Sequence, residues 1–145
     1  MVNAPPDAVD LVPELDVSDL TRSLDFYVRV IGFAVLYERP EEEFSYLGLG
    51  MAQIMLHPRS RWQTGALERP FGRGINLQVN IPDADALLAR LEAAGWPLFH
   101  APEERWYRRG TAYVGVRQFL VQDPDGYLLR FSQRLGFRPQ PPTGR

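Results

Sequence analysis

Apolar and polar residues alternate at the start of the chain and predict a first strand there. From Leu11 to Val17, apolar residues or proline occupy the odd positions, and Glu14 and Asp16 share the opposite face. A period of two is typical of a half-buried strand, so these two carboxylates are expected on one face of a sheet. Pro13 has no amide hydrogen and favours an edge strand or one near a terminus.

A helical pattern follows, with apolar residues three and four positions apart over residues 20–31. Ser18 or Asp19 can cap this helix, and Gly32 stands where a helix ends. Residues 33–38, 44–49 and 51–57 then read as three short strands. The first part of the chain therefore predicts the order strand, helix, strand, strand, strand.

The second half repeats this order. A strand is expected over residues 75–81, a helix between Asp83 and Gly95, a further strand beginning at Trp96, and strands over 112–122 and 127–133. The last two are joined by the turn Asp-Pro-Asp-Gly at 123–126. The predicted fold is α+β, with two tandem βαβββ modules (about 10–57 and 74–135) forming a curved mixed sheet around a concave pocket and helices outside. We expect a single domain over 1–145, with a linker at about 58–73 and flexible termini.

The amino-acid composition excludes several kinds of catalytic and metal site. The 145 residues include no cysteine, no lysine and only two histidines, His57 and His100. This excludes thiolate nucleophiles, zinc-thiolate sites and Schiff bases, and both histidines stand where turns are expected. A net charge of −2 argues against nucleic-acid binding, and no apolar run is long enough to span a membrane. We expect a cytoplasmic protein.

Two segments carry a family resemblance. Val12-Pro13-Glu14-Leu15 with Ser23-Leu24-Asp25-Phe26-Tyr27, and the turn at 123–126 followed by Leu128-Leu129-Arg130, resemble the opening and the closing hairpin of the vicinal-oxygen-chelate superfamily. That superfamily comprises glyoxalases, extradiol dioxygenases and bleomycin resistance proteins. The resemblance covers about residues 10–135.

The resemblance implies four positions at which the enzymes of the superfamily hold a divalent metal. In this chain they fall at or beside Val12, Met55, Asn76 and Arg130, a set that is chemically unsuited to a divalent ion. A shift of register would bring in Glu14 or Gln53. We therefore expect no metal, no cofactor and no catalysis. The resemblance favours the bleomycin resistance branch, whose members are homodimers that sequester the drug.

A bleomycin-like ligand is flat and cationic, so aromatic and acidic side chains are the natural contacts. The ligand-binding candidates are Glu14, Asp16, Phe33, Tyr37, Phe44, Met55, Trp62, Asn76, Gln78, Trp106, Tyr107 and Arg130. Two alternatives remain open: a metal-dependent glyoxalase-like or dioxygenase-like enzyme, and a metabolite-binding protein with no role in resistance. Arg105, Arg108 and Arg109 form either an anion clamp or a surface network with neighbouring acids.

Overall fold

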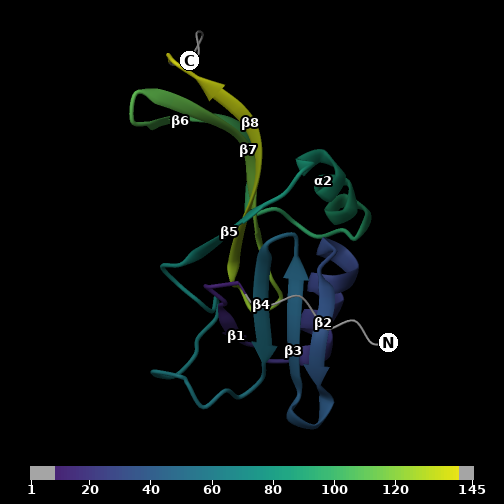
Figure 1. Cartoon of the computed structure of the whole chain (residues 1–145). Coiled ribbons are helices and arrows are strands. Elements are labelled where there is room, and N and C mark those ends of the chain that lie inside the picture. Colours follow the sequence, from purple (N-terminus) through teal and green to yellow (C-terminus); the bar gives the residue numbers. More distant parts are fainter. Residues whose placement is uncertain (1–8, 141–145) are drawn as a thin grey trace, which may run out of the picture. The chain divides into compact units, whose positions relative to one another are not determined.

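A computed structural model describes residues 9–140, which form two compact units (Figure 1). Unit 1 comprises the described residues up to Arg73 together with the turn Asp123–Tyr127, and unit 2 comprises Gly74–Gln122 and the residues from Leu128 onward. Each unit contains one four-stranded mixed sheet, and the strand order is equivalent in both. The predicted α+β fold with two βαβββ modules is therefore confirmed. A single-domain organisation stays a prediction, and the predicted flexible termini lie largely outside the described residues.

The sheet of unit 1 has the order β1-β4-β3-β2. β1 (Glu14–Asp16) runs parallel to β4 (Ala52–His57), while β3 (Phe44–Leu49) and β2 (Ala34–Arg39) complete it in antiparallel fashion. The prediction of a strand over 11–17 was too long. Because Pro13 has no amide hydrogen, it contributes only its carbonyl, which accepts a 2.8 Å hydrogen bond from Met55 N.

The predicted helix of unit 1 forms as two segments. α1 (Leu20–Leu24) is capped by the Asp19 carboxylate, which accepts from Arg22 N, and it continues as the π-helix η1 (Asp25–Ile31) up to Gly32, whose φ is 109°. Together with the 3₁₀-helix η2 (Pro40–Glu42) after β2, these are the helices of unit 1. The apolar face of η1 is fully buried: Phe26, Tyr27, Val30 and Ile31 are each at most 4% exposed. These side chains form the core of unit 1 with Leu47 and Leu56 of the sheet.

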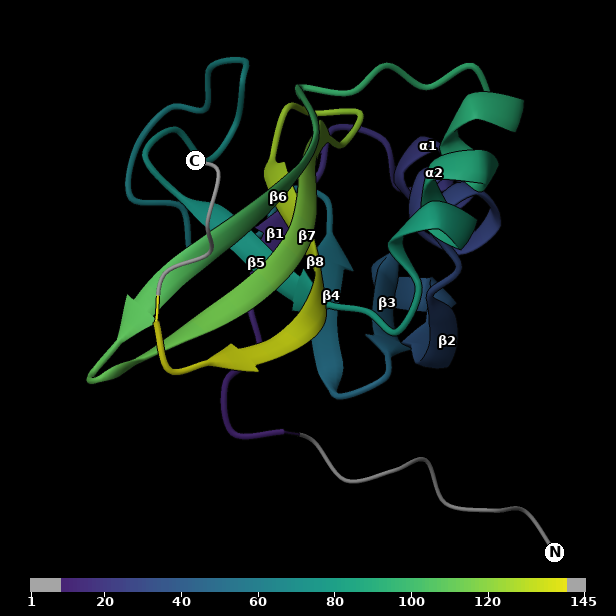
Figure 2. The ribbon, with the colours of Figure 1, turned by 90° about the horizontal axis from the view of Figure 1, so that it is seen from above.

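The sheet of unit 2 has the order β5-β8-β7-β6. Its strands are β5 (Asn76–Asn80), β6 (His100–Arg109), β7 (Ala112–Gln122) and β8 (Leu128–Arg138). The helix α2 (Ala84–Ala93), capped by Asp83, lies on one side of this sheet (Figures 1 and 2) and buries Leu87 and Leu91. The face away from α2 is more polar.

Two predictions for unit 2 were wrong. No strand begins at Trp96, which lies between α2 and β6 and donates from Nε1 to Gln122 O over 2.9 Å. β6 begins instead at His100, and β8 runs on to Arg138. The alternating pattern was hidden because glutamate and arginine occupy both faces of β6. Gly110, with a φ of 64°, supplies the two-residue turn that joins β6 to β7.

No helix within residues 9–140 is both long and apolar enough to cross a membrane.

Candidate functional site

A groove opens on unit 1 where β1, β3 and β4 meet the loop that follows β4. Its volume is about 570 Å³. Three of the sequence-predicted ligand contacts line it, namely Glu14, Phe44 and Trp62. The other lining residues, which the sequence had not indicated as ligand contacts, are Arg39, Glu42, His57, Arg59, Ser60 and Arg61. We call this feature the Trp62 groove.

Strand parity explains how the groove acquires its floor. Leu15 and Leu56 are buried on the helix-covered face, so Glu14 and its register partner Met55 project from the other face. His57 follows Met55 by two residues and lies on the same face. The sequence predicted this face for Glu14 and Met55, of which Glu14 lines the groove and Met55 does not. The same parity argument could have identified His57, which had been expected only as a turn residue.

Aromatic side chains pack side by side at the groove. The ring of Phe44 is 6% exposed, and the Arg39 guanidinium carbon lies 3.9 Å from its centroid. Tyr37 stacks on Tyr46 with 4.7 Å between centroids and 17° between planes, and its centroid lies 6.1 Å from that of Phe44. Offset aromatic packing of this kind gives a rigid apolar surface. Tyr37 therefore lies beside the groove residue Phe44 without itself lining the groove.

The Asp16 carboxylate is hydrogen-bonded within unit 1. One oxygen accepts from Arg59 N over 3.2 Å, and the other accepts from Ser60 N and from Gln63 Nε2 over 2.8 and 2.6 Å. These bonds hold the loop after β4 in place, which in turn positions Trp62. The sequence predicted Asp16 as a ligand contact. In the structure its carboxylate anchors the loop that forms the groove wall, and contact with a ligand stays a prediction. The partners lie more than 40 residues away, so no local pattern could reveal them.

The charges of the groove are mostly paired. Arg39 Nε contacts Glu42 Oε2 at 2.8 Å, and Arg59 forms an ion pair with Glu43. Glu14 is exposed, and its side chain has no hydrogen bond or ion pair with other residues in the range 9–140. The Arg61 guanidinium carbon lies 4.8 Å from the Trp62 ring centroid, and Trp62 is 71% exposed. The groove therefore presents a carboxylate, a guanidinium and an exposed indole, a combination suited to a planar polar molecule.

A second hollow of about 460 Å³ lies beside the start of α1 and shares Phe44 and Arg59 with the Trp62 groove. Its carboxylates include Asp19, which caps α1, and Glu43, which pairs with Arg59. Glu38 is a third carboxylate of this hollow. Since Phe44 is the one predicted ligand contact among its lining residues, against three in the Trp62 groove, the Trp62 groove is the better candidate.

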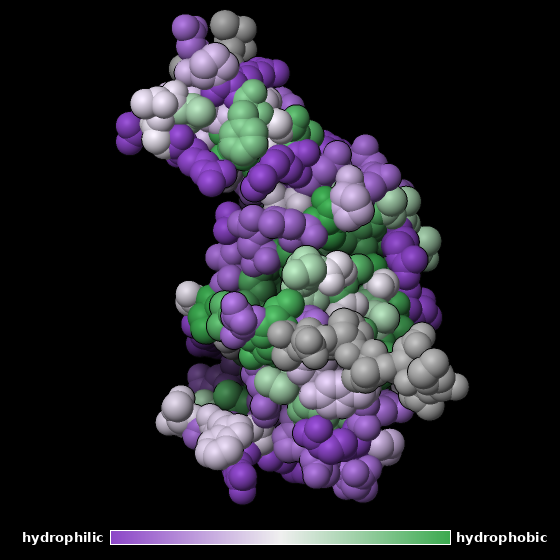
Figure 3. Space-filling view, in the orientation of Figure 1, coloured by the Kyte–Doolittle hydropathy of each residue, from purple (hydrophilic) through white to green (hydrophobic). Residues whose placement is uncertain are grey.

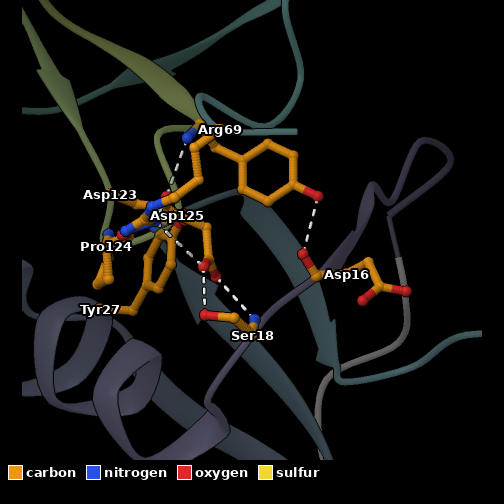
Figure 4. A network of polar contacts seen from close by, with 8 residues as sticks. Asp16, Ser18, Tyr27, Arg69, Asp123, Pro124 and Asp125 are labelled. Atoms are coloured by element: carbon orange, nitrogen blue, oxygen red, sulfur yellow. Dashed lines mark hydrogen bonds and ion pairs between the residues drawn. The ribbon is translucent and has the colours of Figure 1, made fainter. Parts of the chain in front are cut away.

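A buried polar network ties the turn Asp123–Tyr127 into unit 1 (Figure 4). Tyr27 OH donates to Asp123 Oδ2 over 2.8 Å, and Ser18 donates to Asp125 from both its amide and its hydroxyl. Tyr127 OH donates to Asp16 O over 2.9 Å, at the strand that carries Glu14. Burial raises the pKa of Asp123 to about 6. This network supports β1 through the bond to Asp16 O, and none of its residues lines the Trp62 groove.

Phe33 lies in the core and not at a ligand surface. It is 2% exposed, and its ring meets that of Tyr27 edge to face at 5.6 Å. An aromatic residue directly after the helix-ending Gly32 fills the space under the helix. This placement argues against the predicted ligand contact.

The remaining candidates lie on unit 2. Asn76, Gln78 and Arg130 occupy one face of the neighbouring strands β5 and β8, and Gln78 is the register partner of Arg130. On β6, Tyr107 OH accepts a 2.7 Å hydrogen bond from Gln118 Nε2. Trp106 lies on the other face of β6, where its indole packs over Gly115. The guanidinium carbon of Arg138 lies 4.1 Å from the Trp106 ring centroid. This packing against its own sheet favours a structural role for Trp106.

The positions at which the resemblance implies metal ligands do not suit a metal. Val12 and Met55 provide no hard donor, Asn76 provides an amide, and Arg130 provides a fixed positive charge. Within residues 9–140, no group of three or more histidine, aspartate or glutamate side chains is placed to hold an ion. We therefore derive no chemical step through a metal.

Comparison with known proteins agrees with the fold. The family model described as "Glyoxalase/Bleomycin resistance protein/Dioxygenase superfamily" matches residues 12–131. A probable lactoylglutathione lyase of Vibrio cholerae is 26% identical over 125 residues, which cover 82% of this chain and 86% of that protein. A lactoylglutathione lyase of Arabidopsis thaliana is 28% identical over 130 residues, covering 86% of this chain, but the match spans only 44% of the plant protein.

Solved structures share the fold. TioX of Micromonospora sp. ML1 is 25% identical with a TM-score of 0.69, and the match covers 88% of this chain and 100% of TioX. A protein of Alicyclobacillus acidocaldarius shares the fold at 22% identity and a TM-score of 0.64, with 94% and 96% coverage. The two curated relatives are named as lyases and not as bleomycin resistance proteins, so the predicted superfamily is confirmed and the predicted branch is not. The chain belongs to the glyoxalase/bleomycin resistance protein/dioxygenase superfamily.

Proposed function

We propose that this chain is a small-molecule-binding protein that holds its ligand without a divalent metal and leaves it chemically unchanged. The observation that carries the proposal is the side-chain chemistry at the four positions where the superfamily's enzymes hold their metal: a valine, a thioether, an amide and a guanidinium stand there. Among residues 9–140, no group of three or more histidine, aspartate or glutamate side chains is placed near them to hold an ion. The Trp62 groove supplies a binding surface that needs no ion.

The groove favours a planar ligand with polar groups of both signs. Trp62 offers an exposed ring face, Glu14 offers a carboxylate, and Arg61 offers a guanidinium beside Trp62, while the buried Phe44 supports the groove. A bleomycin-type antibiotic stays a candidate ligand, but its support is weaker than the sequence suggested. With Asp16 engaged by the loop, Glu14 is the one carboxylate of the predicted pair left to meet a positive charge.

The test is calorimetric titration of the full chain, in the presence of a chelator, with metal-free bleomycin and separately with S-lactoylglutathione. Saturable binding of either compound is expected. Trp62→Ala should weaken it about tenfold or more, since exposed aromatic residues often dominate recognition. Met51→Ala is the matched control, because Met51 is 83% exposed and does not line the groove.

Equal binding by the Trp62→Ala variant and the wild type would place the ligand elsewhere. Absence of binding by both compounds at about 1 mM would remove these two ligand classes and leave another metabolite.

The second candidate function is lactoylglutathione lyase activity. It is favoured by the names of the curated relatives at 26 to 28% identity. It requires a metal held by residues other than Val12, Met55, Asn76 and Arg130. Turnover of the glutathione hemithioacetal by chain supplied with Zn²⁺ or Ni²⁺, above the rate with the ion alone, would establish it and overturn our proposal.

A further inference from the structure

Arg130 occupies an unusual position on unit 2. Its strand neighbours Leu129 and Phe131 are at most 1% exposed on the side of α2, so Arg130 projects from the opposite face of the sheet. The side chain is half-buried, and its Nε atom is buried without a hydrogen-bond partner. No ion pair within residues 9–140 includes it. The guanidinium is therefore a cation without a counter-charge in the described part of the chain.

The strand neighbours of Arg130 carry no charge. Its register partners are Gln78 on β5 and Leu120 on β7, and Ser132 lies two residues along β8. Glu103, on β6 of the same sheet, is already engaged, since its Oε1 accepts a 3.0 Å hydrogen bond from Gln118 Nε2. The sheet therefore carries a positive charge at Arg130 with neutral neighbours on both adjoining strands.

A buried donor without an acceptor lowers the stability of the folded chain. Arginine stays charged at any physiological pH, so it cannot relieve this cost by losing a proton. A partner from outside the chain would relieve it. The N–H groups of a guanidinium form a planar fork that matches the two oxygens of a carboxylate or a phosphate.

We infer that Arg130 binds an oxyanion group, a carboxylate or phosphate, of a small molecule at a site on unit 2. The inference rests on the proposed small-molecule-binding function only in that the chain holds a small molecule, and it is argued from unit 2 alone. Gln78, the register partner of Arg130, donates one Nε2 hydrogen to Asn80 Oδ1 over 2.9 Å and has a second hydrogen for the same group.

The test is NMR titration of the full chain, following the Nε–H resonance of Arg130. The probes are benzoate, phenyl phosphate and neutral benzamide, which share a ring and differ in charge. The two anions should shift the Arg130 signal in a saturable manner, and benzamide should bind at least about tenfold more weakly, because charge-assisted hydrogen bonds are the stronger kind. Whichever anion binds more tightly identifies the group as carboxylate or phosphate.

Two variants control for charge and folding. Arg130→Gln should weaken anion binding about tenfold or more while retaining the circular dichroism spectrum of the wild type. Arg134→Gln removes an exposed arginine of the same strand and should leave the affinity unchanged. Arg130→Lys keeps the charge but loses the fork, and it should bind with intermediate affinity.

Equal anion affinity in Arg130→Gln and the wild type would overturn the inference while leaving the proposed function intact. Equal affinity for benzamide and benzoate would also overturn it. Failure of all three probes to bind at about 10 mM would exclude an oxyanion site at Arg130. The Trp62 titration with its own ligands would still decide the proposed function independently.

Discussion

At the scale of single residues, the polar side chains of unit 1 divide into those that build the fold and those that remain available. Asp16, Asp123 and Asp125 are all acidic, and all three are committed to hydrogen bonds within the unit. Glu14 has no such partner among residues 9–140. The sequence predicted the face on which Glu14 and Asp16 lie, but it could not separate their roles, because the groups that engage Asp16 come from a distant loop.

The buried carboxyl of Asp123 gives a pH-dependent prediction. Its pKa is about 6 in the folded chain, above the ordinary value of 3.8. The folded state therefore binds the Asp123 proton more strongly than the unfolded state does. The stabilisation of the folded state by this proton is complete below about pH 4 and is lost as the pH rises through about 6. Relative to Asp123→Asn, which stays neutral, the wild type should lose about 3 kcal/mol of unfolding free energy between these limits.

Urea unfolding at several pH values measures this difference. Asp85→Asn is the control, because the Asp85 side chain is 75% exposed and pairs with Arg117 at the surface. A pH dependence that is the same in Asp123→Asn and the wild type would show that Asp123 is not the titrating group.

At the scale of elements, local chemistry predicted helix ends better than strand ends. The cap Asp83 and the terminating Gly32 were predicted from residue type and spacing, and the structure confirms both. Of the two candidate caps Ser18 and Asp19, the structure shows Asp19. β6 was missed because arginine and glutamate stand on both its faces and hide the period of two. The outer part of unit 2, where β6, β7 and β8 continue, has a largely hydrophilic surface with a few apolar side chains (Figure 3). Such a ribbon is held by its hydrogen-bond ladder and by local ring packing, which a hydrophobic pattern does not record.

Trp106 and Gly115 provide the clearest test of that packing. A Cβ atom on Gly115 would lie 2.5 Å from Trp106 Cη2, so Gly115→Ala should displace the indole. Overpacking of this kind costs about 1–3 kcal/mol, and the stability of the chain should fall accordingly. The fluorescence of Trp106 in a variant lacking Trp62 and Trp96 would report the displacement.

Gly65→Ala is the matched control, since a Cβ at Gly65 meets no atom within 4 Å. Unchanged stability and unchanged Trp106 fluorescence in Gly115→Ala would contradict the close packing of the indole on Gly115.

At the scale of the whole molecule, the superfamily and the repeated module could be predicted from the sequence, while the site could be predicted only in part. Two short motifs and a repeated order of elements were enough to predict the fold. Glu14, Phe44 and Trp62 were expected as ligand contacts, and all three line one groove, although their contact with a ligand stays a prediction. Their neighbours Arg39, His57 and Arg61 come from three different segments, and only the folded sheet brings them together. The predicted homodimer and bleomycin as the ligand also stay predictions.

The central claim is that this chain binds its ligand without a divalent metal. The most direct measurement is calorimetric titration of untagged, chelator-treated chain with Zn²⁺ and with Ni²⁺. We expect no saturable binding of either ion below about 100 μM. Binding of one ion per chain, with a dissociation constant below about 1 μM, would contradict this claim and favour the lyase alternative.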